Sequence, residues 1–143
     1  SDQRSSGARD AFAEYPNITV SSYATNWDAI QSYDITTDEL TKLGGDLNAV
    51  VGVGTGMAEA AADAILTFGG NLDDVVVGSF DITDAVIEGL ENGNVDYSIN
   101  QQPFYQAYFS VAACVQYLNG LDVPDRIGTP VAFVTLENLD QHR

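Results

Sequence analysis

Four short apolar runs constrain the fold of this chain more than any other feature. They are rich in β-branched residues and are bounded by Gly, Pro, Asn or Asp, and they span Ile18–Tyr23, Ala49–Val53, Val75–Phe80 and Val131–Val134. Such runs are typical of buried parallel strands. Between them the apolar residues recur with a helical period, as at Met57, Ala61, Ile65 and Phe68. The alternation predicts a three-layer, doubly wound α/β fold with a mostly parallel sheet and helices on both faces.

Chain length and local signals refine this prediction. With 143 residues, 45% of them hydrophobic, the chain suffices for one core, so we expect a single α/β lobe over residues 1–143. Thr83 is a candidate helix start and Asn92-Gly93 a helix stop. A short strand is predicted at Tyr97–Asn100, and Pro103 after it suits the first turn of another helix.

The order of the elements suggests that the sheet lacks its first strand. The pattern opens with a helix, Ser5–Tyr15, whereas a doubly wound sheet opens with a strand that lies centrally. Without that strand the sheet has unpaired edges and an exposed core. We therefore expect the chain to be part of a longer polypeptide, or to be completed by another chain. Direct pairing of Ile18–Tyr23 with Ala49–Val53 would contradict this expectation.

The predicted helix over residues 103–119 also indicates a missing partner. Its apolar residues face nearly all directions, and they are Phe104, Tyr105, Tyr108, Phe109, Val111, Cys114, Val115, Tyr117 and Leu118. A surface helix needs only one apolar stripe, so this helix should be covered on both sides.

The charge balance excludes some function classes. The chain has 21 Asp plus Glu against 5 Lys plus Arg, a formal net charge of -16, and such a field disfavours nucleic-acid binding. Solubility alone needs a charge magnitude of only about 2 to 8 in a small domain. We interpret the excess as adaptation to concentrated salt, with an ordinary acidic protein as the alternative.

A glycine-rich turn and the scarcity of nucleophiles bear on catalysis. Gly52, Gly54 and Gly56 follow a strand, but their G-x-G-x-G spacing departs from the dinucleotide fingerprint, so a plain strand-to-helix turn is favoured over a nicotinamide site. The only histidine is His142, the only cysteine, Cys114, is expected in the core, and no metal-ligand spacing is present. We therefore predict no catalytic residue, no metal and no cofactor. Asn17-Ile18-Thr19 fits a glycosylation acceptor, although Pro16-Asn17 is first of all a turn.

Polar and aromatic residues follow the predicted strands at their carboxyl ends, where open α/β sheets bind ligands. Asp81 follows Val75–Phe80, Gln101 and Gln102 follow the next strand, and Trp27 follows Ile18–Tyr23. A carboxylate accepts from neighbouring hydroxyls, an amide both donates and accepts, and an indole stacks on the C–H face of a sugar. Trp27 is equally compatible with a core position.

Together these segments resemble the type I periplasmic sugar-binding proteins, the ribose-binding-like receptors of ABC importers. The resemblance covers essentially the whole chain, and its specific part is Gly78-Ser-Phe-Asp81 followed by Asn100-Gln-Gln-Pro103. It implies the C-terminal lobe of a two-lobed receptor, with the 103–119 helix packed on the absent N-terminal lobe. It also implies sugar contacts from Arg4, Trp27, Asp81 and Gln101.

Two departures from the family pattern affect the site. Gly54-Thr55 stands where the family has Asn-Asp, so an amide contact is lost and we expect a wider pocket. Asn100 stands where the family has Asp, which removes a charge near the hinge. Gly54, Thr55 and Asn100 are therefore further candidate ligand-binding residues.

The resemblance implies reversible capture of a monosaccharide or related small sugar, without bond chemistry. The implied partners are the ABC importer's membrane subunits and an N-terminal lobe or other chain that completes the sheet. The implied location is extracytoplasmic, periplasmic or at the cell surface, with a lipid anchor in an upstream segment as one option. The effector-binding core of a LacI-type transcription regulator and a nicotinamide-dependent enzyme remain alternatives.

The hypothesis of salt adaptation predicts a higher melting temperature in molar salt than in low salt. Screening shortens to about 3 Å at 1 M, so that repulsion among the acidic groups no longer opposes the compact state. Thermal melts followed by circular dichroism at the two salt concentrations test this, and an unchanged midpoint would contradict it.

Overall fold

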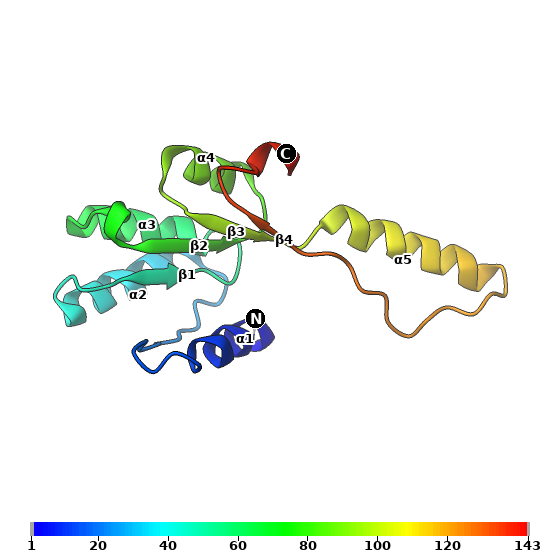
Figure 1. Ribbon diagram of the computed structural model, residues 1–143, viewed down its shortest axis with the longest axis horizontal. Helices are drawn as coiled ribbons and strands as arrows, with labels where there is room; N and C mark the ends of the chain where they lie inside the picture. The colour runs from blue at the N-terminus through cyan, green and yellow to red at the C-terminus, as the bar shows by residue number, and fades with distance from the viewer. Residues whose placement is uncertain (1, 143) are drawn as a thin grey trace.

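The computed structural model describes residues 2–142, which form a four-stranded mixed sheet (Figure 1). The strands are β1 (Ala49–Val51), β2 (Val76–Phe80), β3 (Tyr97–Asn100) and β4 (Ala132–Val134), in the order β1-β2-β3-β4. β1, β2 and β3 are parallel, as predicted.

The prediction that Val131–Val134 is a parallel strand is wrong, because β4 pairs antiparallel with β3. After β3 the chain leaves the sheet through α5 (Pro103–Leu118) and returns as an extended segment to the same end of the sheet (Figure 1). No crossover carries it back to the start of β3, and a parallel strand requires such a crossover.

Three helices cover one face of the sheet. They are α2 (Ala29–Leu43), α3 (Met57–Phe68) and α4 (Asp84–Asn92), and short 3₁₀ turns lie at Leu72–Asp74 and Leu139–Gln141. As predicted, α4 starts after Thr83, whose hydroxyl accepts from the Val86 N–H, and ends at Gly93 in the left-handed region. The core on this face consists of Leu40, Ala58, Ala62, Ile65, Val75, Val77, Val86, Leu90, Val95, Val134 and Leu139.

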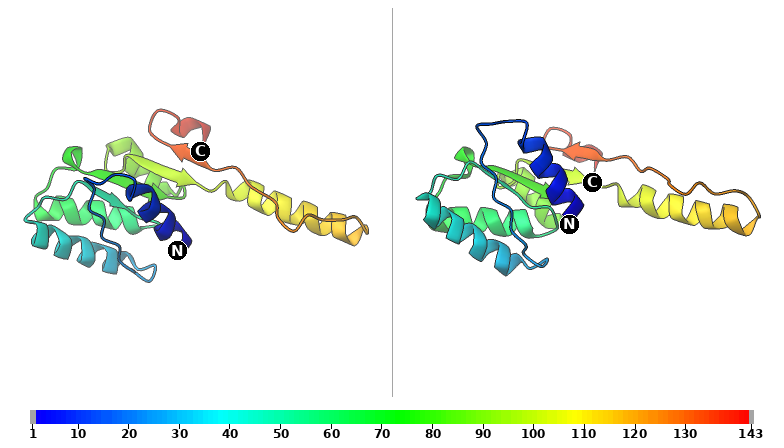
Figure 2. Two further views of the ribbon diagram at one scale, coloured as in Figure 1. Left: turned by 60° about the horizontal axis from the view of Figure 1, so that its bottom comes forward. Right: turned by 90° about the horizontal axis from the view of Figure 1, so that it is seen from below.

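The opposite face of the sheet is only partly covered. Helix α1 (Asp2–Phe12) lies on this side (Figure 2), three residues ahead of its predicted bounds at both ends. Tyr97 lies over Gly78 and stacks on Phe133 with ring centroids 4.7 Å apart. Burial raises the pKa of the Tyr97 hydroxyl, and the charge of Asp96 adds to the effect. Val76 on this face remains 49% exposed.

The predicted strand Ile18–Tyr23 does not form. The segment is irregular, and Ile18, Val20 and Tyr23 are exposed. β1 is the edge strand on this side, and no strand among residues 2–142 pairs with its outer edge. A strand requires a hydrogen-bonded neighbour. For Ile18–Tyr23 that neighbour would be the central strand expected between this segment and β1, and no described residues form it. The segment does not pair with β1, so the expectation of an absent central strand is not contradicted.

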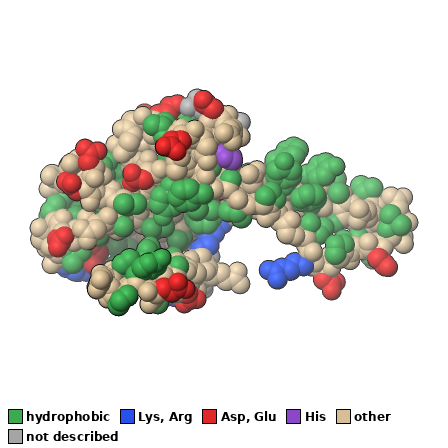
Figure 3. All heavy atoms as spheres, in the orientation of Figure 1, with side chains coloured by type: hydrophobic (Ala, Val, Ile, Leu, Met, Phe, Trp, Pro, Cys, Tyr) green, Lys and Arg blue, Asp and Glu red, His purple; other side chains and the backbone are tan. Residues whose placement is uncertain are grey.

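Helix α5 stands away from the body of the molecule and buries none of its residues (Figure 3). Phe104, Tyr117 and Leu118 are each at least 70% exposed. Cys114 is exposed as well, so its predicted core position is wrong: among the described residues, the returning segment 123–129 lies along part of α5 and leaves Cys114 in solvent. Within residues 2–142, no helix is long and apolar enough to cross a membrane.

The packing of α3 predicts a strong contrast between adjacent residues. Ile65 is fully buried in the core and Leu66 is 47% exposed. We expect Ile65→Ala to lower the free energy of unfolding by about 2–5 kcal/mol, because it removes buried methyl groups and leaves a cavity. The control, Leu66→Ala, should change it by less than about 1 kcal/mol. Urea unfolding followed by circular dichroism measures both, and equal losses would contradict this packing.

Candidate ligand-binding site

The carboxyl ends of β2 and β3 bring three predicted site residues together. Asp81 directly follows β2 and Gln101 directly follows β3. The Gln101 side-chain amide donates to Asp81 Oδ1, and its Oε1 accepts from Arg4 Nη2 at 2.7 Å. Arg4 comes from α1, so this chain of hydrogen bonds joins the second face of the sheet to the strand ends.

Arg4 is also held from two further directions. Its Nη1 donates to the backbone carbonyl of Val53 at 2.8 Å, and its guanidinium carbon lies 4.1 Å from the centre of the Phe80 ring. A guanidinium over an aromatic face is attracted by the ring's electron density. These contacts fix the plane of the guanidinium. The sequence carries no signal for the roles of Phe80 and Val53, because both residues have apolar side chains.

The backbone around Asp81 is locked in an unusual conformation. Asp81 has a φ of 70°, in the left-handed region that Asp tolerates better than most residues. Its N–H donates to the Ile99 carbonyl at 2.9 Å, and its carbonyl accepts from the Ser98 hydroxyl at 2.5 Å. Thr55 donates to Asp81 Oδ2 at 3.2 Å. Asp81 is therefore oriented by groups from β3 and from the turn before α3.

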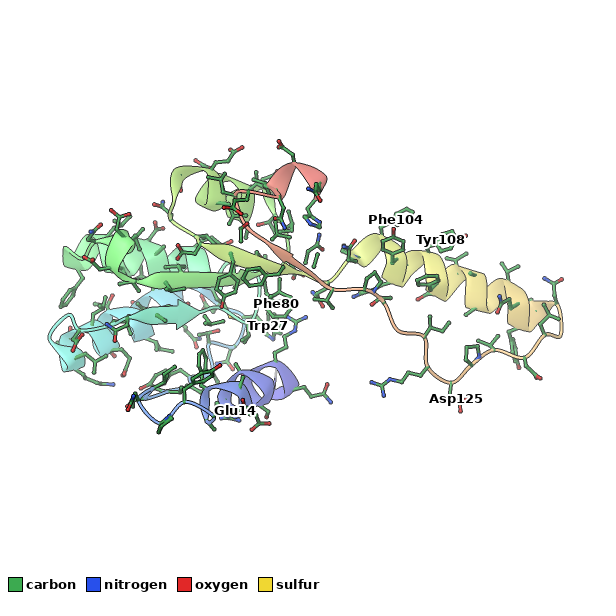
Figure 4. The ribbon with its side chains drawn as sticks, in the orientation of Figure 1. Glu14, Trp27, Phe80, Phe104, Tyr108 and Asp125 are labelled. Atoms are coloured by element: carbon green, nitrogen blue, oxygen red, sulfur yellow. The ribbon has the colours of Figure 1, made fainter. Side chains whose placement is uncertain are left out.

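Trp27 lies at the same end of the sheet, on the turn that leads into α2 (Figure 4). Its ring packs against Gly54, and it is 59% exposed, so it is not a core residue. A Cβ on Gly54 would lie 2.3 Å from Trp27 Cζ3. The indole fills the space that the missing side chain leaves, so Gly54 affects the width of the pocket only through the position of that ring.

Asn100 serves the turn between β3 and α5. It is buried, and its Oδ1 accepts from the backbone N–H of Gln102 at 2.8 Å. Gln102 has a φ of 58° and precedes Pro103 at the start of α5. The geometry thus gives Asn100 a structural role in directing the chain out of the sheet.

The glycine turn does not match a dinucleotide site in three dimensions. A pyrophosphate must approach the second glycine of the fingerprint closely, and here that glycine, Gly54, is covered by Trp27. Among residues 2–142, no cluster of three His, Cys, Asp or Glu side chains is arranged to hold a metal ion.

The remaining hydrogen-bonding capacity of this cluster suits hydroxyl groups. A guanidinium has five N–H donors and two of those on Arg4 are engaged, while a carboxylate has about four lone-pair directions. The cluster therefore offers a cationic donor, an anionic acceptor and an amide within one small area, next to an exposed aromatic ring.

The sequence matches a known protein family over most of its length. Residues 1–122 match the periplasmic binding protein domain. The chain belongs to the periplasmic binding protein family. The resemblance drawn from the Gly78–Asp81 and Asn100–Pro103 segments is thus confirmed at the level of the family.

A curated relative and two solved structures illustrate the match. A putative rhizopine-binding protein of Rhizobium meliloti is 31% identical over 120 residues, 84% of this chain and 38% of that protein. An ABC transporter solute-binding protein from Actinobacillus succinogenes, solved with D-allose, superimposes with a TM-score of 0.89 at 28% identity and covers 98% of this chain and 49% of that one. One from Bacillus halodurans, solved with myo-inositol, gives a TM-score of 0.83 at 30% identity over 97% and 48%.

These periplasmic binding proteins are longer than the chain. It spans 38% of the curated relative and about half of each solved structure. The described α/β domain accordingly corresponds to part of a type I periplasmic binding protein, as the predicted fold class implies.

The conformation of Asp81 predicts an order of stability among substitutions at this position. Asp81→Asn keeps a residue type that tolerates a positive φ, whereas Asp81→Ala does not, so the alanine variant should be less stable by about 1 kcal/mol. Chemical unfolding of both variants measures the difference. An alanine variant as stable as the asparagine variant would show that the left-handed conformation is not maintained.

Proposed function

We propose that this chain is the ligand-gripping half of an ABC-importer receptor that reversibly binds a monosaccharide or a related cyclic polyol. The observation that supports the proposal is the hydrogen-bonded group Arg4–Gln101–Asp81 beside the exposed ring of Trp27. These residues lie at the carboxyl ends of parallel strands, where ligands of open α/β sheets bind.

In the proposed complex each residue has a distinct task. Asp81 accepts hydrogen bonds from adjacent hydroxyls, and Arg4 donates to a ring or hydroxyl oxygen. Charge-assisted bonds of this kind contribute about 1.5–3 kcal/mol each when shielded from water. Trp27 stacks on the apolar face of the ring, which adds about 0.5–1.5 kcal/mol beyond burial. Thr55 supports Asp81 and is close enough to share its ligand.

The proposed mechanism requires a second lobe. The two solved relatives described above are solute-binding proteins about twice the length of this chain, one solved with D-allose and the other with myo-inositol. We propose that the uncovered helix α5 packs on that lobe and that the lobes close over the sugar, stabilised by contacts from both sides. The importer's membrane subunits would then recognise the closed, extracytoplasmic receptor, which a lipid anchor would tether. No catalytic step is involved.

The proposal predicts that the chain alone binds sugar weakly, because one lobe supplies only part of the contacts. Calorimetry should detect little or no binding of D-allose or myo-inositol to the 143-residue chain, whereas the two-lobed receptor should bind at least one member of a panel of monosaccharides and cyclitols. Tight binding by the chain alone would contradict the two-lobed mechanism.

In the two-lobed receptor, Asp81→Asn should weaken binding of the sugar so identified by about 10- to 150-fold, the equivalent of one charge-assisted hydrogen bond. Asp73→Asn, which removes the same charge from an exposed residue near the opposite end of β2, is the matched control and should leave affinity unchanged. Equal affinities of the two variants, or no binding by the receptor across the panel, would overturn the proposed function.

A further inference from the structure

The Trp27 ring occupies the space that a side chain at position 54 would need. A Cβ at position 54 would lie 2.3 Å from Trp27 Cζ3, 2.8 Å from its Cε3 and 3.2 Å from Met57 Cε. Carbon atoms in ordinary contact are about 3.5–4.0 Å apart. The Cε3–Cζ3 edge of the indole's six-membered ring thus lies against the glycine backbone.

Position 54 requires glycine because the indole occupies the space of a side chain, and not because the backbone conformation excludes other residues. Gly56 in the same turn has a φ of 80°, which disfavours other residues, but Gly54 has no positive φ. An alanine could therefore adopt the backbone at position 54, and only the indole stands in its way. The consequence of a side chain here would be a displaced ring.

The backbone turn that carries Trp27 is itself held in place by several contacts. Asn26 and Trp27 have φ values of 50° and 63°, as the two central residues of a type I′ turn require, and the Asp28 N–H donates to the Thr25 carbonyl at 2.8 Å. Asp28 also caps α2 by accepting from the Ile30 N–H. The Thr25 hydroxyl lies 3.4 Å from Met57 Sδ, which ties the turn to the start of α3.

One edge of the indole is therefore held against Gly54, while the residue as a whole remains 59% exposed. We propose that Gly54 is a specificity-determining position: by lacking a Cβ it sets the position of the Trp27 ring beside Asp81 and Arg4, and so which sugar or cyclitol ring fits against the indole. The inference rests on the proposed function of Trp27 as a stacking platform. A side chain at position 54 displaces the ring by roughly 1.2–1.7 Å, the difference between the 2.3 Å separation and a normal carbon–carbon contact of about 3.5–4.0 Å.

The first test follows the ring without ligand. Trp27 is the only tryptophan in the chain, so its fluorescence reports this contact alone. Gly54→Ala should shift the emission maximum to longer wavelength and increase quenching by acrylamide, because the ring moves outward into water. Gly128→Ala, at a glycine with no atom within 4 Å of an added Cβ, is the control and should leave both unchanged. An unchanged spectrum in Gly54→Ala would overturn the proposed contact.

The second test is a double-mutant cycle for ligand affinity in the two-lobed receptor, with D-allose and myo-inositol as probes. Gly54→Ala should weaken binding by roughly 2- to 12-fold, the range of an aromatic stacking contact. In a receptor that already carries Trp27→Phe, Gly54→Ala should lower the ligand affinity by less than about twofold, because phenylalanine lacks the ring atoms that meet the Cβ. A purely structural role of Gly54 would give equal losses in both backgrounds, and that result would overturn the inference.

The two proposals fail in different ways. If Gly54→Ala alters fluorescence but not affinity, while Asp81→Asn still weakens binding, the specificity role of Gly54 is refuted and the sugar site stands. If neither variant changes affinity for either probe, the proposed function is refuted as well, and the fluorescence result then describes packing alone.

Discussion

The hydrogen bonds from Arg4 through Gln101 to Asp81 join segments that are 97 and 20 residues apart in the sequence. They connect α1, on one face of the sheet, to the ends of β2 and β3, and the Arg4 contact to Val53 adds the turn after β1. Because both charged groups are half-buried, each needs these partners to offset the loss of water. The same partners orient the charges toward one area.

Two uncovered surfaces share one physical origin. The sheet face that carries Val76 and Phe133 is only partly shielded by α1, and α5 buries none of its residues. Apolar surface of this extent is costly in water and typically marks a contact with further protein. The chain spans about half of its solved relatives, whose remaining length is available to form such contacts. The position of the cluster beside α5 agrees with a ligand held between two lobes.

The glycine-rich turn before α3 shows how one motif serves several purposes. A Cβ at Gly52 would lie 2.6 Å from the Ala58 backbone nitrogen, so this glycine allows the helix to pack closely on the strand. Gly54 accommodates the indole of Trp27, and Gly56 supplies a positive φ before the helix begins. Three glycines that the sequence marks as a strand-to-helix turn therefore have three separate structural reasons.

Local signals in the sequence predicted three strands, at Ala49–Val53, Val75–Phe80 and Tyr97–Asn100, and both ends of α4, because apolar period and capping chemistry act over a few residues. In the structure the first strand ends two residues earlier and the second begins one residue later. The order of motifs also determined the family. The direction of β4, the unpaired state of Ile18–Tyr23 and the exposure of Cys114 depended on which neighbours are present, and no local pattern carries that information. The filling of Gly54 by Trp27 was likewise decided by tertiary structure, since contacts between residues 27 positions apart arise only when the turns before α2 and α3 are brought together.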